Sequence, residues 1–284
     1  MHSPKIIKIP NGFISRIITY LNHKDLDVGV VDKYIVPLFG SPQHGWIDIK
    51  RNSLTKGDFL YALTHSKAAV KETTLIPGET KEIFFEQLSK KWNFSYEKLL
   101  DLYDKYSPYP DGVLIPESYN VPMGFNEEQL IKYILNYSLK RHKELSYKYL
   151  NHFDQKEWFE KYVTIASIIQ KEAANKEEMP LVSAVIYNRL KIGMKLQMDG
   201  ALNYGKYSHV KVTKKRITDD NSRFNTYKYE GLPPYPLCSV SKHAIISALF
   251  PADNNYLYFV KSKDNKHLFS SSYKKHLQNI KNGK

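Results

Sequence analysis

The hydrophobic positions of the chain recur with a helical period over most of its last two thirds. Apolar residues lie three and four positions apart over residues 126–149 and 154–174, and both ranges are predicted to be amphipathic helices. A third helix is predicted between Pro180, which suits a first helical turn, and Gly193, which suits a C-terminal stop. Long amphipathic helices of this kind pack their apolar faces into a common core.

Strand signals are few in the same region. A further helix is predicted near 241–249, a hydrophobic strand follows at 255–260, and residues 268–280 resemble a strand end that leads into a terminal helix. Residues 206–224 are polar and basic and are predicted to form a long loop. Helices with a few strands between them indicate an α+β fold rather than alternating βαβ units.

The first third contains a weak internal repeat. The stretches 9–21 and 76–88 each run Ile-Pro, then a glycine, then an amphipathic segment that ends in leucine. A strand that leads into a Pro-Gly turn and a helix is a compact βα unit, so the repeat suggests a duplicated small module, although so few matches also arise by chance. A helix capped by Ser95 is expected over 95–106, and the proline-rich stretch 107–125 is predicted to be irregular.

One position breaks the apolar pattern of the helix predicted at 154–174. Ile165, Ile168 and Ile169 share one face, and the next position of that stripe is Glu172. Three explanations are open: an ion pair with a buried cation, a place at the helix end where the stripe no longer matters, or a carboxyl group that lines a cleft. In a cleft, burial would keep the acid protonated near neutral pH, which is the property that a general acid needs.

If Glu172 is catalytic, cleavage of a glycosidic bond is a natural reaction, because the leaving oxygen needs a positioned acid. An ordinary glycosidase uses a second carboxylate, for which Asp199 is the candidate. A single carboxylate also suffices when it protonates the leaving oxygen and then takes the proton of a hydroxyl group in the same substrate.

Composition and charge narrow the range of partners and cofactors. The 284 residues include 42 Lys+Arg against 29 Asp+Glu, and the formal net charge of +13 attracts anionic polymers without choosing among them. Helix-turn-helix, RNP and zinc-finger spacings are absent from the sequence, so nucleic acid is not the expected partner. Cys238 is the only cysteine, the histidines lack ligand spacing and no phosphate-binding glycine motif occurs, so we expect neither a metal nor a cofactor.

Several motifs occur in one order along the chain. The first is "DGVLIPESY", and the second is the run between Ile165 and Gly205 that contains "ASIIQKEA" and "AVIYNRLKIGMKLQMDGALNYG". The other three are "NSRFNTY", "GLPPYPL" and "PADNNYLYFV". Together they closely resemble the signature of the YceG-like family, the endolytic murein transglycosylases. Five motifs in one order, over about 160 residues of this chain, are far more specific than any one of them.

This resemblance implies a membrane-anchored enzyme that acts outside the cytoplasmic membrane on nascent peptidoglycan strands. It would cleave the MurNAc–GlcNAc β-1,4 bond without water and leave a 1,6-anhydro-MurNAc end. The catalytic glutamate of the family follows the lysine of its K-E motif and maps onto Glu172, which would act as general acid and then as general base. Gln170 stands where many members have a second acid, which removes a competitor for that role.

The other motif residues take substrate-binding roles by the same resemblance, with a structural role as the alternative for each. The residues expected to bind substrate are Glu117, Tyr119, Asn188, Gln197, Asp199, Asn225 and Tyr227. The departures from the family pattern at Met198, Gly200, Arg223 and Val240-Ser241 lie in loops, so they concern loop shape and the preferred substrate strand more than the reaction type.

The resemblance also implies a domain order. Residues 108–284 would form a helix-rich catalytic domain with a small sheet, preceded by small LysM-like βα modules at 1–72 and 73–107. Glycan strands of peptidoglycan are the expected partner, cell-wall synthases are further candidates, and an N-terminal membrane anchor is expected outside this chain. The alternative function is a non-catalytic protein that binds peptidoglycan and positions glycan strands or synthases.

Overall fold

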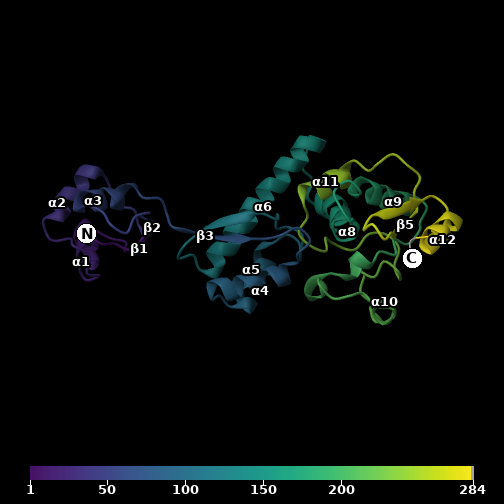
Figure 1. Ribbon diagram of the computed structural model, residues 1–284, viewed down its shortest axis with the longest axis horizontal. Helices are drawn as coiled ribbons and strands as arrows, with labels where there is room; N and C mark the ends of the chain where they lie inside the picture. Colours follow the sequence, from purple (N-terminus) through teal and green to yellow (C-terminus); the bar gives the residue numbers. More distant parts are fainter. Residues whose placement is uncertain (283–284) are drawn as a thin grey trace. The chain divides into compact units, whose positions relative to one another are not determined.

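The structure, a computed structural model, describes residues 1–282 and divides into two compact units (Figure 1). Unit 1 comprises Met1–Thr73 and Tyr119–Asn126, and unit 2 comprises Thr74–Ser118 and the chain from Glu127 onward. The chain passes from one unit to the other within the paired strands β3 (Val70–Thr74) and β4 (Ser118–Pro122).

Unit 1 combines a two-stranded antiparallel sheet with three helices around one core. In the sheet Ile7 lies opposite Ile47, and both side chains are buried with Leu21 and Phe59. The elements before β3 are β1 (Ile6–Ile9), α1 (Ile14–Asn22), α2 (Asp32–Phe39), β2 (Gly45–Asp48) and α3 (Lys56–His65).

Unit 2 is mostly helical, with a two-stranded antiparallel sheet near the C-terminus. Its elements are α4 (Lys81–Trp92), α5 (Tyr96–Tyr106), α6 (Glu127–Leu150), α7 (Gln155–Glu157), η1 (Trp158–Val163), α8 (Thr164–Glu172), α9 (Met179–Lys191), η2 (Asp199–Leu202), η3 (Gly205–Tyr207), α10 (Lys214–Asp219), α11 (Lys242–Leu249), β5 (Tyr258–Lys261), β6 (His267–Ser270) and α12 (Tyr273–Asn282). Helices with small sheets confirm the predicted α+β class.

The element order β-α-α-β occurs twice in the first half of the chain. It runs through β1, α1, α2 and β2, and again through β3, α4, α5 and β4. Helices α1 and α4 begin at Ile14 and Lys81, so they keep the 67-residue offset of the sequence repeat. The contacts group α4 and α5 with the rest of unit 2 and show no division at residue 107, while the LysM-like nature of both segments stays a prediction.

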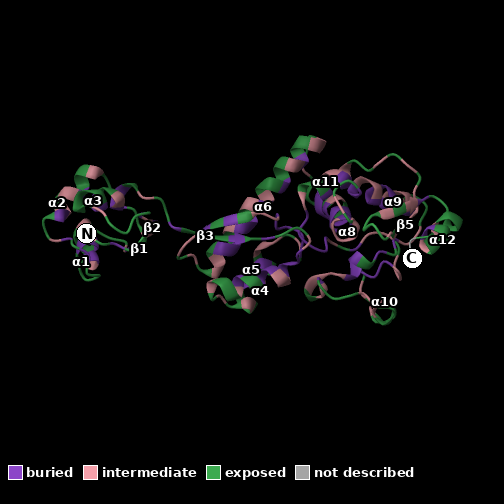
Figure 2. Ribbon diagram, viewed as in Figure 1, coloured by how far each residue is buried: buried purple, intermediate pink, exposed green. Residues whose placement is uncertain are grey.

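Helix α8 lies at the centre of unit 2, where it packs against α9, α11, η1 and η2. Ile165, Ile168 and Ile169 are each at most 1% exposed, as the apolar stripe predicted (Figure 2). The predicted helix 154–174 runs from α7 to α8, but its middle, η1, is a π-helix that periodicity did not predict. The hydroxyl of Thr164 donates a hydrogen bond to the Phe159 carbonyl at 2.8 Å, where the wide turn meets the α-helix.

A buried hydrogen-bond chain ties η1 to α6. The indole of Trp158 donates to Nδ1 of His142 at 3.0 Å, and Nε2 of His142 lies 3.1 Å from the Val113 carbonyl. Because Nδ1 accepts a bond, the ring is neutral with its proton on Nε2. Burial lowers the pKa of His142 to about 4, in agreement with that neutral state.

Capping residues explain where several helices begin. Ser95 and Ser241 accept hydrogen bonds from backbone amides and cap α5 and α11, in agreement with the predicted starts. The prediction of a continuous loop over 206–224 is wrong, since Thr213 caps the short helix α10 within it. Among residues 1–282, the helices are all too short or too polar to cross a bilayer.

Candidate active site

Glu172 is the last residue of α8. The next residue, Ala173, is extended, so the helix stops where the carboxyl group begins. The three buried isoleucines hold the helix in the core, and the side chain of Glu172 lies partly exposed beyond them. A helix C-terminus carries partial negative charge, which disfavours an ionised carboxylate there.

A cleft of about 500 Å³ adjoins this helix end. Its walls come from the end of α8, from η2 and from the chain between η3 and α10. The lining residues are Lys171, Glu172, Asp199, Gly200, Asn203, Ser208, His209, Val210, Lys211 and Val212. Asp199, His209 and Lys211 are exposed, so the cleft is accessible from solvent.

The environment of Glu172 favours its protonated form. Burial raises its pKa to about 7, and the nearby charge of Asp199 acts in the same direction. The backbone N–H of Gly200, which donates to Oε1 at 2.6 Å, and the charge of Arg189 oppose the rise. A carboxyl group with a pKa near neutrality gives up and takes back a proton at little free-energy cost, as acid–base catalysis requires.

Gly200 leaves no space for a side chain. A Cβ atom at this position would lie 2.7 Å from Cβ of Lys171 and 2.8 Å from Oε1 of Glu172. Glycine therefore lets the backbone approach the carboxyl group closely, and its N–H fixes the position of that group. This contact gives a physical role to one of the departures from the family pattern.

Asp199 is held at the rim of the cleft by a network with the segment around Tyr227. The phenol of Tyr227 donates to Oδ1 of Asp199 at 2.6 Å. Backbone bonds from Gln197 to the Thr226 carbonyl (3.1 Å) and from Met198 to the Thr226 hydroxyl (3.0 Å) join the two segments. Gln197 itself is exposed, with a φ of 48° that reverses the chain before Asp199. The structure thus brings Asp199 and Tyr227 together with Glu172, while Gln197 is joined to this group only through its backbone.

Two of the predicted site residues have their amide groups in hydrogen bonds that hold the fold. Asn225 is buried and donates to the carbonyls of Ile217 and Asp220, both at 2.8 Å, so it shapes the loop that carries Tyr227. Asn188 donates to the carbonyls of Asn254 and Tyr256, both at 3.0 Å. These contacts favour the structural alternative for both residues.

Arg189 follows Asn188 and is also committed to the backbone. It donates to the carbonyls of Leu257 (2.7 Å) and Leu196, and it is only 7% exposed. Its positive charge nevertheless acts on Glu172. Arg189 is therefore not among the residues that line the cleft, but its charge contributes to the electrostatic environment of Glu172.

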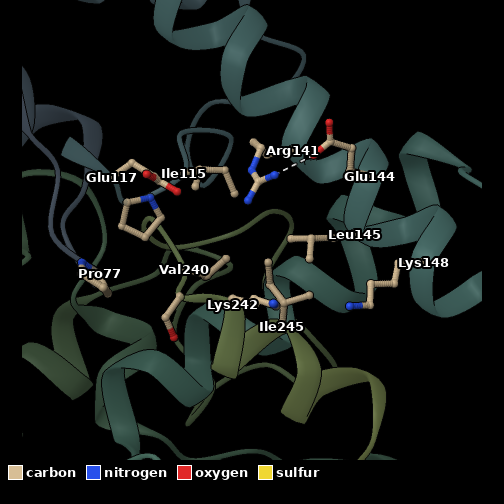
Figure 3. A pocket seen from close by; sticks show the side chains of 12 residues that line it. Pro77, Ile115, Glu117, Arg141, Glu144, Leu145, Lys148, Val240, Lys242 and Ile245 are labelled. Carbon is tan, nitrogen blue, oxygen red and sulfur yellow. Dashed lines mark hydrogen bonds and ion pairs between the residues drawn. The ribbon is translucent and has the colours of Figure 1, made fainter. Parts of the chain in front are cut away.

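Glu117 and Tyr119 do not line this cleft. Tyr119 belongs to unit 1 and is buried there. Glu117 belongs to unit 2 and lines a separate pocket with residues of α6 and α11 (Figure 3). Neither of these two predicted substrate-binding residues therefore lies in the cleft with Glu172.

The cleft also contains residues that the sequence did not point out. The ammonium of Lys171 donates to the Ser208 hydroxyl at 2.8 Å, which ties the loop after η3 to the residue before Glu172. His209 pairs with the buried carboxylate of Glu79 at 3.0 Å. The K-E motif in the sequence pointed to Lys171. A single histidine in a polar segment has no comparable motif, so His209 was not indicated by the sequence.

Comparison with known proteins defines the family. A sequence profile described as the YceG-like family matches residues 7–282. The chain belongs to the YceG-like family. A crystal structure of a YceG-like protein from Listeria monocytogenes has the same fold, with a TM-score of 0.63 at 23% identity over 98% of this chain and 99% of that one.

Relatives with a functional name are also similar to this chain. The chain is 28% identical over 223 residues to the endolytic murein transglycosylase of Bacillus subtilis, and 30% identical over 232 residues to that of Streptococcus pneumoniae R6. The matches cover 75% and 79% of this chain, but only 60% and 40% of the two relatives. The chain therefore spans less than two thirds of the length of either protein.

Proposed function

We propose that this chain cleaves the MurNAc–GlcNAc β-1,4 bond of peptidoglycan strands by lytic transglycosylation, with Glu172 as the catalytic residue. The observation that carries the proposal is the placement of one carboxyl group, with a pKa of about 7, in an accessible cleft at the end of a buried helix. The names of the relatives agree with this reaction.

The reaction needs one group that gives and then takes a proton. Protonated Glu172 donates its proton to the glycosidic oxygen, and the bond from that oxygen to C1 of MurNAc breaks. The C6 hydroxyl of the same sugar attacks C1, and the Glu172 carboxylate accepts the hydroxyl proton. The products are a free GlcNAc hydroxyl and a 1,6-anhydro ring, and the enzyme returns to its protonated state without consuming water.

Neighbouring groups support each step. The Gly200 N–H stabilises the carboxylate that forms after the first proton transfer and holds Oε1 in place. Asp199, fixed by Tyr227, supplies negative charge beside the developing oxocarbenium ion. The walls of the cleft are exposed, which suits a polymer that enters along its length, as internal cleavage requires.

The test is mass spectrometry of glycan strands digested with the protein. Lytic products with anhydro ends are roughly 20 Da lighter than reduced muropeptides from hydrolysis, as expected for loss of one water and one unreduced end. We expect anhydro ends with the wild type and with Glu177→Gln, an exposed control nearby, and none with Glu172→Gln. Full activity of Glu172→Gln would refute the assignment.

Binding without turnover is the competing outcome. If the folded wild type pellets with cell walls but releases no products, the protein positions glycan strands instead of cutting them. The same proposal includes action outside the cytoplasmic membrane, an anchor beyond this chain and contact with wall synthases. These three features rest on the resemblance to the family.

A further inference from the structure

A second pocket of unit 2, distinct from the cleft of Glu172, combines charged and apolar groups. It measures about 350 Å³, near the lower end of the roughly 300–1,000 Å³ typical of small-ligand sites. Its walls come from residues 115–117, from one side of α6 and from the start of α11 (Figure 3). Among the residues that line the two cavities, none is shared.

The rim of this pocket carries more positive than negative charge. Arg141 pairs with Glu144 at 2.7 Å, and both side chains are nearly half exposed. Lys148 and Lys242 line the pocket as well, and within residues 1–282 neither ammonium has a carboxylate within 4.0 Å. Two cations are therefore available for the carboxylates of a ligand.

The remaining groups restrict what kind of anion fits. The floor is apolar, since Ile115, Val240 and Ile245 are at most 8% exposed. The carboxylate of Glu117 faces the same space (Figure 3), where it and Glu144 would repel a polyanion such as nucleic acid. A short peptide with carboxylates, a free amine and small apolar side chains is complementary to this combination.

The pocket lies next to the catalytic cleft along the chain. Oε1 of Gln170 accepts a hydrogen bond from the backbone N–H of Ser241 at 3.1 Å, so a residue that lines the pocket is attached to α8 two positions before Glu172. Pro77 lines the pocket, and Glu79, two residues later, pairs with His209 in the cleft.

Backbone hydrogen bonds join the two segments that follow Pro77 and precede Val240. Gly78 donates to the Ser239 carbonyl at 2.9 Å, and Ser239 donates to the Glu79 carbonyl at 2.8 Å. These bonds join residues 78–79 to residue 239, which precedes the pocket residues Val240 and Ser241. The segment from Pro77 to Glu79 thus connects a residue that lines the pocket with one whose partner, His209, lines the cleft.

We infer that this pocket binds the short peptide that branches from a peptidoglycan strand, with Lys148 and Lys242 receiving its carboxylates and Glu117 its amine. The inference rests on the proposed function for the identity of the ligand. It explains why Glu117, which belongs to a family motif, lies outside the cleft.

Direct binding of a synthetic peptide tests the pocket without any turnover. The probe is a pentapeptide of alanine, γ-linked glutamate, lysine and two alanines, titrated into the full chain by calorimetry. We expect Lys148→Gln/Lys242→Gln to bind it about five- to tenfold more weakly than the wild type, because exposed ion pairs contribute modestly. Lys143→Gln, on α6 but outside the pocket lining, should bind like the wild type. Equal binding by the double variant, or no binding by the wild type, overturns the inference.

A modified probe separates the two kinds of charge. Acetylation of the lysine amine should weaken binding to the wild type but not to Glu117→Gln, since that variant has already lost the carboxylate partner. An equal loss in both proteins would contradict the role of Glu117.

Turnover then separates this inference from the proposed function. The value of kcat/KM is measured on strands with peptides and on strands without them. The first value divided by the second should be above one for the wild type and should fall toward one for the double variant. A wild-type ratio of one, with anhydro products formed, refutes the pocket and leaves the reaction intact. A third outcome is that the wild type binds the peptide, the double variant does not, and no variant forms products. This outcome supports the pocket and refutes the reaction. Thermal unfolding of each variant confirms that it is folded.

Discussion

Replacing Glu172 with glutamine should stabilise the protein at neutral and alkaline pH. Burial raises the pKa of Glu172 from 4.5 to about 7, so between these values the folded chain holds a proton that the unfolded chain releases. The wild type therefore loses stability as pH rises through this window, and the loss is complete above pH 7. One pKa unit corresponds to about 1.4 kcal/mol, so the rise from 4.5 to about 7 gives a total of about 3.5 kcal/mol.

Glutamine is neutral at every pH, and its carbonyl can still accept the hydrogen bond from the Gly200 N–H. The assay is urea unfolding of both proteins at a series of pH values from 4 to 8.5. The difference in the free energy of unfolding should be close to zero at pH 4 and should approach about 3.5 kcal/mol in favour of the variant above pH 7. Glu177→Gln provides the baseline for the loss of one exposed carboxylate.

A difference that stays constant from pH 4 to 8.5 would refute the reasoning, because it would mean that Glu172 is ionised at neutral pH. The same pKa should appear in the activity of the wild type. Its kcat/KM is expected to fall about tenfold per pH unit above pH 7, as the general acid loses its proton.

Three further substitutions test contacts of the cleft and of the fold around it. Gly200→Ala should lower kcat by at least about tenfold and also lower the free energy of unfolding, since its Cβ would collide with Cβ of Lys171 and displace Glu172; wild-type turnover would contradict this. Tyr227→Phe should lower kcat about tenfold by freeing Asp199, and an unchanged kcat would show that Asp199 needs no anchor. Asn188→Ala should lower the free energy of unfolding by about 1–2 kcal/mol, measured by urea titration, because two partly buried carbonyls lose their donor; unaltered stability would argue for a role in the cleft.

Local pattern was enough to predict much of unit 2. The stripe of Ile165, Ile168 and Ile169 predicted a buried helix, and the interruption at Glu172 left three explanations open, among them the helix end and the cleft that the structure places there. Both follow from periodicity, which depends only on near neighbours in the sequence. The cap residue Ser95 predicted a helix start for the same reason.

Contacts between distant segments were beyond such reasoning. The hydrogen bond between Gly200 and Glu172 joins residues that are 28 positions apart, and the pair of His209 with Glu79 spans 130. Polar residues also look alike in sequence whether they face substrate or hold a loop. Asn225 was therefore grouped with Asp199, although its amide is fully used by its own loop.

The π-helix η1 determines which changes in chain length α8 tolerates. A π turn contains one residue more than an α turn, so loss of one residue from Trp158–Val163 converts it to an α turn and leaves the buried faces on both sides in phase. A deletion between Thr164 and Lys171 has no such outlet, and it would rotate Glu172 by about 100° around the helix axis, away from Gly200. Insertions and deletions among related chains should therefore accumulate at η1, while the spacing from there to the glutamate stays constant.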